Sequence, residues 1–359
     1  MIEPELWSGR RVLVTGHTGF KGAWLCLWLQ RLGARVSGLS LGPPTSPSLY
    51  ELACVRDGMA AEVAADLRDF GAVRGAIAAA RPEIVLHLAA QSLVGRSYTD
   101  PRETYETNVM GTVNVLEAVR TSPGVRVAIT VTSDKCYDNR EEGRPFVEDD
   151  PMGGHDPYSS SKGCAELVVS AYQRSFFSGD DAGIARVASG RAGNVIGGGD
   201  WGEQRLIPDV MRAALAGSVI EIRQPDAVRP WQHVLNPLVG YLRLAEVLFE
   251  DPDAAGGWNF GPSAGDMRPV RWIVDRLTDL WSEELRWRVA EGPRPHEAGH
   301  LTLDSAKARE RLGWRPVWGL ELALERIVSW YLALRAGRDM RQVSTGQIES
   351  FSAAAMAAA

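Results

Sequence analysis

The sequence lacks long apolar runs and any excess of positive charge. No stretch approaches the ~20 consecutive apolar residues that a membrane-spanning helix requires. The formal net charge of −6 offers no basic field to a nucleic-acid backbone. Residues 1–5 have neither the basic region nor the apolar run of a secretion signal. We therefore expect a cytoplasmic protein that binds small molecules, with no nucleic acid and no membrane among its partners.

Cysteine is also scarce. The 359 residues include four cysteines, which form no C-x-x-C pair and show no spacing typical of metal ligands. This pattern predicts reduced, packed thiols and no metal site. The cysteines are Cys26, Cys54, Cys136 and Cys164.

Lysines account for only four of the 39 residues that carry positive charge. A lysine provides a compact ammonium group of adjustable acidity, which the permanently charged guanidinium of arginine cannot replace. Lys21, Lys135 and Lys162 fall within the motifs described below, whereas Lys307 is expected on the surface. The placement of the first three indicates a chemical role.

Segments of strand length alternate with segments of helical periodicity over residues 1–188. This alternation is typical of an α/β fold with a doubly wound parallel Rossmann sheet, which binds its ligands at the carboxyl ends of the strands. The expected strands cover 11–15, 35–41, 62–65, 84–88, 125–132 and 184–188, and the expected helices include 70–80, 103–120 and 158–177.

The regular alternation ends near residue 188. Helices, short strands and Pro/Gly breaks then mix, which predicts a smaller, mixed C-terminal substrate lobe over 189–345. A segment near 232–260 is expected to return to the first domain. Residues 346–359 are rich in alanine and are expected to form a disordered tail.

The turn between the first strand and the first helix carries three glycines in the pattern G-x-x-G-x-x-G. Gly16, Gly19 and Gly22 allow a sharp turn and let phosphate oxygens reach backbone N–H groups. Lys21 lies in the first turn of the helix, where a cation opposes the helix dipole by ~0.3–1 kcal/mol unless an anion is near. The turn therefore predicts a bound dinucleotide rather than a purely structural bend.

The second strand ends without the acid that usually binds the ribose of NAD. Residues 37–42 contain no Asp or Glu, and no Arg for a 2′-phosphate. We favour NAD over NADP, with Ser40 as a weaker ribose partner. Asp66 is either an adenine contact or a helix N-cap. His17 is either a phosphate contact or a turn residue.

Tyr158 and Lys162 are four residues apart and lie on one face of an expected helix. A tyrosine pKa of ~10 is too high for a base at neutral pH, and a nearby cation lowers it. Ser133, Asp134 and Lys135 follow the strand that ends near residue 132, so a hydroxyl, a carboxylic acid and an amine reach the same sheet edge. The alternative for Ser133 or Asp134 is a helix or turn cap.

Three motifs together resemble the extended short-chain dehydrogenase/reductase family, in its group of sugar-nucleotide dehydratases and epimerases. They are Gly16-x-x-Gly19-x-x-Gly22, Tyr158-x-x-x-Lys162 and Thr107-Asn108-Val109-x-Gly111-Thr112. The resemblance covers most of the chain. Four stretches are most similar to the CDP-glucose 4,6-dehydratases of that family. They are Gly16 to Gly22, Thr132 to Tyr137, Arg191 to Trp201 and Arg229 to Val234.

The resemblance implies NAD as cofactor and CDP-glucose as substrate, with NAD reduced and reoxidised on one sugar. Tyr158 would take the proton from O4, Ser133 would hold O4, and Asp134 would protonate the C6 hydroxyl that leaves as water. The product would be a 4-keto-6-deoxy sugar nucleotide of deoxysugar biosynthesis. Dehydratases acting on dTDP-glucose and GDP-mannose have a glutamate, their C5 base, where this chain has Lys135. We hypothesise that Lys135 is the C5 base, with burial and nearby cations favouring its neutral amine.

The family positions also imply the contacts of cofactor and substrate. For the cofactor they are Gly16, His17, Gly19, Phe20, Lys21, Gly22, Ser40, Asp66, Leu67, Leu88, Ala89, Ala90, Asn108, Tyr158 and Lys162. For the substrate they are Gln91, Asn194, Arg229, Trp231, Arg294 and His296. The two arginines suit a diphosphate, because the guanidinium group can donate two parallel hydrogen bonds to it. The family pairs through the helix that holds the tyrosine, so we expect a homodimer or homotetramer.

Two other functions are open at this point. A sugar-nucleotide 4-epimerase would share the glycine turn, the fold and the Tyr158/Lys162 pair. Asp134 and Lys135 argue against it, since epimerisation at C4 needs no acid for a C6 hydroxyl. A non-catalytic dinucleotide sensor would need the turn but no tuned phenol.

Overall fold

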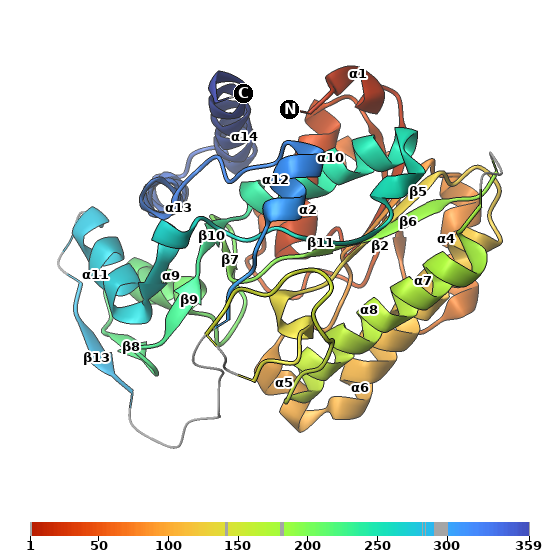
Figure 1. Ribbon diagram of the computed structural model, residues 1–359. Coiled ribbons are helices and arrows are strands. Elements are labelled where there is room, and N and C mark those ends of the chain that lie inside the picture. Colours follow the sequence, from red (N-terminus) through yellow and green to blue (C-terminus); the bar gives the residue numbers. More distant parts are fainter. Residues whose placement is uncertain are drawn as a thin grey trace.

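A seven-stranded parallel sheet organises the molecule (Figure 1). The computed structural model describes residues 2–140, 143–179, 183–281, 283, 285–290 and 301–358. The strand order β11-β6-β5-β4-β1-β2-β3 is that of a doubly wound Rossmann sheet, as the alternating sequence predicted. The strands are β1 (Arg11–Thr15), β2 (Arg35–Ser40), β3 (Ala61–Ala64), β4 (Ile84–His87), β5 (Val127–Val131), β6 (Arg186–Arg191) and β11 (Gly256–Asn259).

Apolar side chains on both faces of the strands build two cores. In β1, Val12 and Val14 belong to the larger core while Leu13 belongs to the smaller one, because successive side chains of a strand point to opposite faces. The larger core is covered by α2 (Phe20–Arg31) and α10 (Leu235–Glu250), and the smaller by α4 (Phe70–Ala80), α7 (Gly111–Arg120) and α8 (Pro157–Phe176). Each face of the sheet is thus sealed by helices (Figure 1).

The helix expected over 103–120 consists of three parts. Short α6 (Pro101–Tyr105) runs into a π-helical turn (Glu106–Met110), which continues as α7. The π turn is a wide turn of a kind often found at functional sites, and it carries Asn108. The remaining short elements before it are α1 (Pro4–Trp7), α3 (Leu49–Leu52) and α5 (Val94–Thr99).

The later half of the chain builds a second, smaller body beside the strand ends. It contains three two-stranded sheets, and β11 leaves it to join the main sheet beside β6. Its elements are β7 (Val195–Ile196), α9 (Leu206–Ala216), β8 (Ile220–Ile222), β9 (Val228–Pro230), β10 (Gln232–His233), β12 (Met267–Pro269), α11 (Val270–Leu280), β13 (Trp287–Val289), α12 (Ala306–Leu312) and α13 (Leu320–Arg335).

The expectation of a disordered tail over 346–359 is wrong for its described residues. They form most of α14 (Met340–Ala357), whose Phe351 is fully buried and packs edge-on against Trp28 of α2. Alanine has the highest helix propensity, so the alanine-rich end extends the helix once Ile348 and Phe351 are buried. No helix in the described ranges is long and apolar enough to cross a membrane.

Candidate active site

The glycine turn joins β1 to α2 and leaves no room for a side chain at two of its glycines. Gly16 has a φ of +73°, and a β-carbon on it would lie 2.7 Å from the backbone of Ala89, which follows β4. A β-carbon on Gly22 would lie 2.1 Å from the carbonyl oxygen of Gly16. The turn therefore requires glycine at both positions and brings the start of α2 against the end of β4.

The start of α2 is built to receive an anion. Gly19 is the N-cap and supplies no side-chain acceptor, and the first turn contains no acidic residue. Its amide groups and the helix dipole favour a negative charge there. Burial, with Lys162 and Arg205 nearby, lowers the pKa of Lys21 in this turn to about 8. A phosphate would relieve that accumulation of positive charge, so this cradle fits a dinucleotide pyrophosphate.

His17 faces the second and third strands. Its ring packs on Gly38 of β2, where a β-carbon would lie 2.5 Å from Nδ1, and its Nε2 lies 2.9 Å from Glu62 Oε1 of β3. Tyr50 also donates to Glu62. Burial lowers the pKa of His17 and Glu62 only partly offsets this, which favours the neutral ring. These contacts favour the turn-residue alternative for His17 over the phosphate contact.

The two expected contacts on the adenosine side differ in their surroundings. Ser40 ends β2 and lies 2.8 Å from Thr18 Oγ1, which donates to the carbonyl of Leu41. Ser40 therefore donates to Thr18 and keeps lone pairs for a ribose hydroxyl. Asp66 binds Arg68 at 2.6 Å, and the N-cap of α4 is Asp69. The N-cap alternative for Asp66 is thus wrong, because the cap lies three residues further on.

The strand ends bring the expected catalytic residues together. Tyr158 and Lys162 are buried one turn apart in α8, and Ser133 hydrogen-bonds the phenol of Tyr158. Burial raises the pKa of Tyr158 to about 12, while Ser133 lowers it. Burial lowers the pKa of Lys162 to about 8, against Glu166, which raises it. The expected lowering of the tyrosine pKa is therefore not found, because the cost of burying a phenolate outweighs the hydrogen bond of Ser133 and the charge of Arg205.

Asp134 is a buried acid at the end of β5. Its Oδ1 accepts a 2.9 Å hydrogen bond from Ser133, and the structure gives Oδ2 no protein partner. Burial raises the pKa of Asp134, while Lys135, Ser133 and Lys21 lower it. Ser133 is also the N-cap of the short turn over 134–136, so its cap role and its contact with Tyr158 coexist. A carboxyl group in this environment is suited to donate a proton.

Asn108 and Gln91 are occupied by internal hydrogen bonds. Asn108 donates to Ser161 of α8 at 2.8 Å and exchanges two bonds with the backbone of Gln91. The side chain of Gln91 bonds Leu93 and Thr104. The π turn thus connects the loop after β4 to the catalytic helix, a bracing role that sequence reasoning did not assign to these two residues.

The expected substrate residues are spread over the smaller body. Asn194 is half-buried after β6, and Arg229 of β9 bonds the carbonyl of Val228. Trp231 is buried and donates to the carbonyl of Arg268 at 3.1 Å, so core packing explains it. Arg294 and His296 lie outside the described residues.

Sequence reasoning missed two charged residues near the catalytic group. Arg205 spans the two bodies, with its guanidinium 2.9 Å from Ser92 and 3.2 Å from Asp200, and its charge reaches Lys21 and Tyr158. Glu166 lies one turn after Lys162. The sequence could have indicated Glu166, because it lies four residues after Lys162 and residues four apart share a helix face. No sequence pattern indicated Arg205, because it precedes α9 in a loop.

Among the remaining expected cofactor contacts, Leu67, Leu88, Ala89 and Ala90 follow β3 and β4 at the same carboxyl edge, and Phe20 begins α2. In the described ranges no group of three or more His, Cys, Asp or Glu side chains could hold a metal ion.

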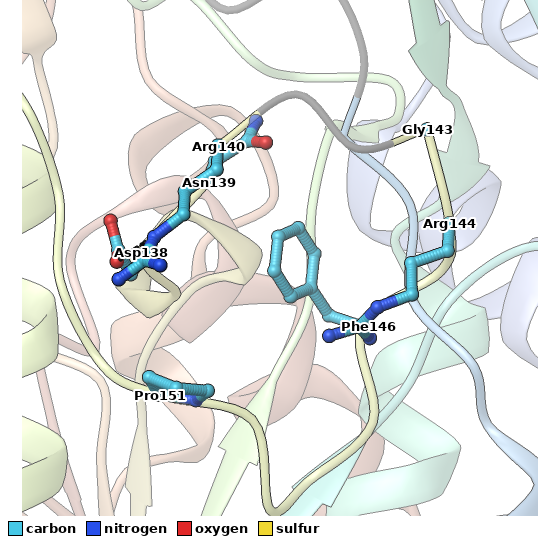
Figure 2. A pocket seen from close by; sticks show the side chains of 7 residues that line it. All are labelled: Asp138, Asn139, Arg140, Gly143, Arg144, Phe146 and Pro151. Atoms are coloured by element: carbon cyan, nitrogen blue, oxygen red, sulfur yellow. Dashed lines mark hydrogen bonds and ion pairs between the residues drawn. The ribbon is translucent and has the colours of Figure 1, made fainter.

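A separate cavity of about 230 Å³ lies in the segment after Lys135. Figure 2 shows the Phe146 ring between Arg144 and the side chains of Asp138 and Arg140. Asp138 pairs with Arg140 at 2.8 Å, and Asp150 pairs with Arg144 at 2.7 Å. The cavity contains no catalytic residue, and its arginines are already neutralised.

Comparisons with known proteins agree with this geometry. The model of the NAD dependent epimerase/dehydratase family matches residues 12–253. A CDP-glucose 4,6-dehydratase of Salmonella typhimurium is 49% identical over 358 residues, which is 99% of both chains. Rice UDP-glucose 4-epimerase 3 is 27% identical and covers 88% of this chain and 87% of its own.

Solved structures extend the likeness to proteins with bound NAD. Thermus thermophilus UDP-glucose 4-epimerase, in complex with NAD, has a TM-score of 0.76 at 26% identity, covering 90% of this chain and 99% of its own. The dTDP-glucose 4,6-dehydratase of Streptomyces venezuelae, with NAD bound, has a TM-score of 0.74 at 26% identity, covering 92% and 99%. With its glycine turn and its buried tyrosine and lysine, the chain belongs to the NAD dependent epimerase/dehydratase family.

Proposed function

We propose that this protein dehydrates CDP-glucose to CDP-4-dehydro-6-deoxyglucose, with NAD as its cofactor. The observation that carries the proposal is Asp134, a buried acid beside Ser133 and Tyr158 in a chain 49% identical to a CDP-glucose 4,6-dehydratase. The chemistry that bound NAD would supply is hydride transfer, from C4 of the sugar and later back to C6. The cradle at Gly16 and the start of α2 would hold its pyrophosphate.

Three side chains divide the proton transfers, and a fourth holds the reacting oxygen. Tyr158 takes the proton of the O4 hydroxyl, and Ser133 holds that oxygen. Oxidation at C4 makes the C5 proton acidic, and Lys135 removes it. Asp134 protonates the C6 hydroxyl, which leaves as water. The raised pKa of Asp134 supports this role, because a carboxyl must keep its proton until the leaving group departs.

The same acid favours dehydration over 4-epimerisation. An epimerase moves a proton only at O4, for which Tyr158 suffices, whereas Asp134 is a second proton donor within the same buried cluster. The raised proton affinity of both groups supports a working site over a non-catalytic sensor, since buried titratable groups are costly without a use.

The smaller body, which lies within residues 189–345, is proposed to bind the nucleotide end of the substrate. Asn194, Arg229 and Arg205 are the donors proposed for the diphosphate. Arg205 is added to the family set because its charge already reaches the catalytic tyrosine.

The proposed assembly is a homodimer or homotetramer formed through the face that α8 shares with its neighbours. Exposed apolar side chains gather on α5, α6, the π turn and α8, which supports an interface there. They are Tyr98, Tyr105, Met110, Leu167 and Phe176, each at least 36% exposed.

Mass spectrometry tests the proposed reaction. Purified protein with NAD is incubated separately with CDP-glucose, UDP-glucose, dTDP-glucose and GDP-mannose. The expected result is loss of one water from CDP-glucose alone. A product of unchanged mass but altered C4 configuration would show an epimerase, and no product with any of the four would refute the proposal.

A further inference from the structure

Glu166 accepts three hydrogen bonds within the protein. Its carboxylate binds the hydroxyl of Thr132, the hydroxyl of Ser189 at 2.7 Å and the guanidinium of Arg191 at 2.7 Å. All four residues are at most 5% exposed. The carboxylate thus ties α8 to the ends of β5 and β6, and one of its partners, Thr132, directly precedes Ser133 in the chain.

Arg191 extends this contact to the other side of the catalytic segment. It donates to the hydroxyl of Tyr137 at 2.6 Å and to the carbonyl of Glu148 at 2.9 Å, and Tyr137 donates to Asn259 at 2.7 Å. The segment that holds Ser133, Asp134 and Lys135 lies between Thr132 and Tyr137. Both of its ends are therefore fixed by one ion pair.

The ion pair also sets the charge around Lys162. Lys21 of α2, His87 of β4 and Cys136 face that ammonium together with Glu166. Burial lowers the pKa of His87 to about 3 and raises the pKa of Cys136, so both are neutral, and Lys21 repels the ammonium. Glu166 is the leading influence that raises the pKa of Lys162.

Fold stability alone does not explain a buried ion pair here. Well-packed apolar residues of similar volume are often as stable as a buried pair, or more stable. A pair is useful where orientation matters, because its hydrogen bonds fix angles as well as distances.

We propose that Glu166, held by Arg191, is a positioning residue of the reaction: it aligns Ser133 and Asp134 with Tyr158 and keeps Lys162 charged. This inference rests on the proposed dehydratase function. In this proposal the oxidation at C4 needs the deprotonated Tyr158, and a charged Lys162 one helical turn away favours that phenolate. The rate therefore rises with pH only until Lys162 loses its proton. Glu166 therefore decides at which pH that rise ends.

The test is the pH profile of kcat/KM for dehydration of CDP-glucose by the NAD-loaded enzyme. Glu166→Gln keeps the shape of the side chain and removes its charge. The bend of the profile is the pH at which the rise of kcat/KM ends. In Glu166→Gln this bend should move to lower pH by about 1 unit, and kcat/KM above the bend should fall about tenfold. A purely structural residue would lower the rate at every pH and leave the bend in place.

Thr132→Val covers the case in which Glu166→Gln does not fold. It keeps the ion pair and removes the hydroxyl next to Ser133, so kcat should fall about tenfold while KM stays within about twofold. The matched control is Glu349→Gln, which breaks an exposed pair between α14 and Arg31 of α2 and should leave the bend and the rate unchanged.

The outcomes separate the two hypotheses. A wild-type protein that removes no water from CDP-glucose refutes the proposed function. If the wild type is active and the bend stays in place in Glu166→Gln, only the positioning role is refuted. If Glu166→Gln cannot be purified, an unchanged kcat in Thr132→Val refutes that role instead.

Discussion

Gly193 lies against Asp134 so closely that a β-carbon at residue 193 would be 1.9 Å from Asp134 Oδ2. Gly193→Ala should displace the carboxyl from Ser133 and lower the rate of dehydration at least about a hundredfold, since ~1 Å of misplacement can cost that much. The measurement is release of the 4-keto-6-deoxy product. Gly75→Ala in α4, where a β-carbon meets nothing within 4 Å, should keep full activity. An active Gly193→Ala enzyme would remove Asp134 from its role.

Lys135→Met should stop exchange at C5. The methionine keeps the length of the side chain but cannot accept a proton, so deuterium from the solvent should no longer appear at C5 of the sugar. Mass spectrometry of product formed in heavy water measures this. Undiminished dehydration with C5 labelling would exclude Lys135 as the base.

Lys21→Ala should weaken NAD binding. The lysine lies in the first turn of α2 without an acidic neighbour in that turn, so a bound pyrophosphate is its natural counterion. We expect the Kd for NAD to rise at least about tenfold, or ~1.4 kcal/mol, as measured by calorimetry. Arg31→Ala, at the far end of the same helix, should leave the Kd unchanged, and equal affinities of all three proteins would contradict the prediction.

The oxidation step should depend on pH in two regimes. Tyr158, with a pKa of about 12, is protonated at neutral pH, so the rate should rise with pH as the phenolate fraction grows. Near pH 8 Lys162 begins to lose its charge, and the rise should end. Initial rates from pH 6 to about 10 test this. A rate that already falls between pH 6 and 8 would contradict these assignments.

Helix α14 should contribute strongly to stability. Phe351 is fully buried against Trp28 and Trp318, so Phe351→Ala should lower the free energy of unfolding by about 3–5 kcal/mol. Urea denaturation measures the loss. Met356→Ala, at an exposed position of the same helix, should stay within about 0.5 kcal/mol of the wild type. Equal stability of the two variants would show that the helix is dispensable.

The sheet and the catalytic group were predictable because each rests on a local pattern. Strand-length apolar runs located β1 and β4, and the four-residue spacing placed Tyr158 and Lys162 on one helix face. The fate of the last residues depended on distant partners, since Phe351 of α14 is buried by packing on Trp28 of α2 and on Trp318. Local composition cannot reveal such a partner.

Electrostatic effects were harder to predict than positions. The spacing of Tyr158 and Lys162 suggested a lowered tyrosine pKa, but the sign depends on how far the surrounding chain excludes water. For the same reason the sequence left His17 open between a phosphate contact and a turn residue, because Glu62, which holds its ring, is 45 residues away. Only the packed strands bring these two together.

The pairing of β11 with β6 makes the two halves of the chain inseparable. A fragment ending at residue 188 would cut through β6 and leave β5 as an open edge, ready to pair with other chains. Recombination between relatives at that point would exchange the smaller body together with β11, which completes the main sheet. A change of nucleotide specificity by domain exchange would therefore also have to transfer β11 and its contacts. Point substitutions in the smaller body are the simpler evolutionary route.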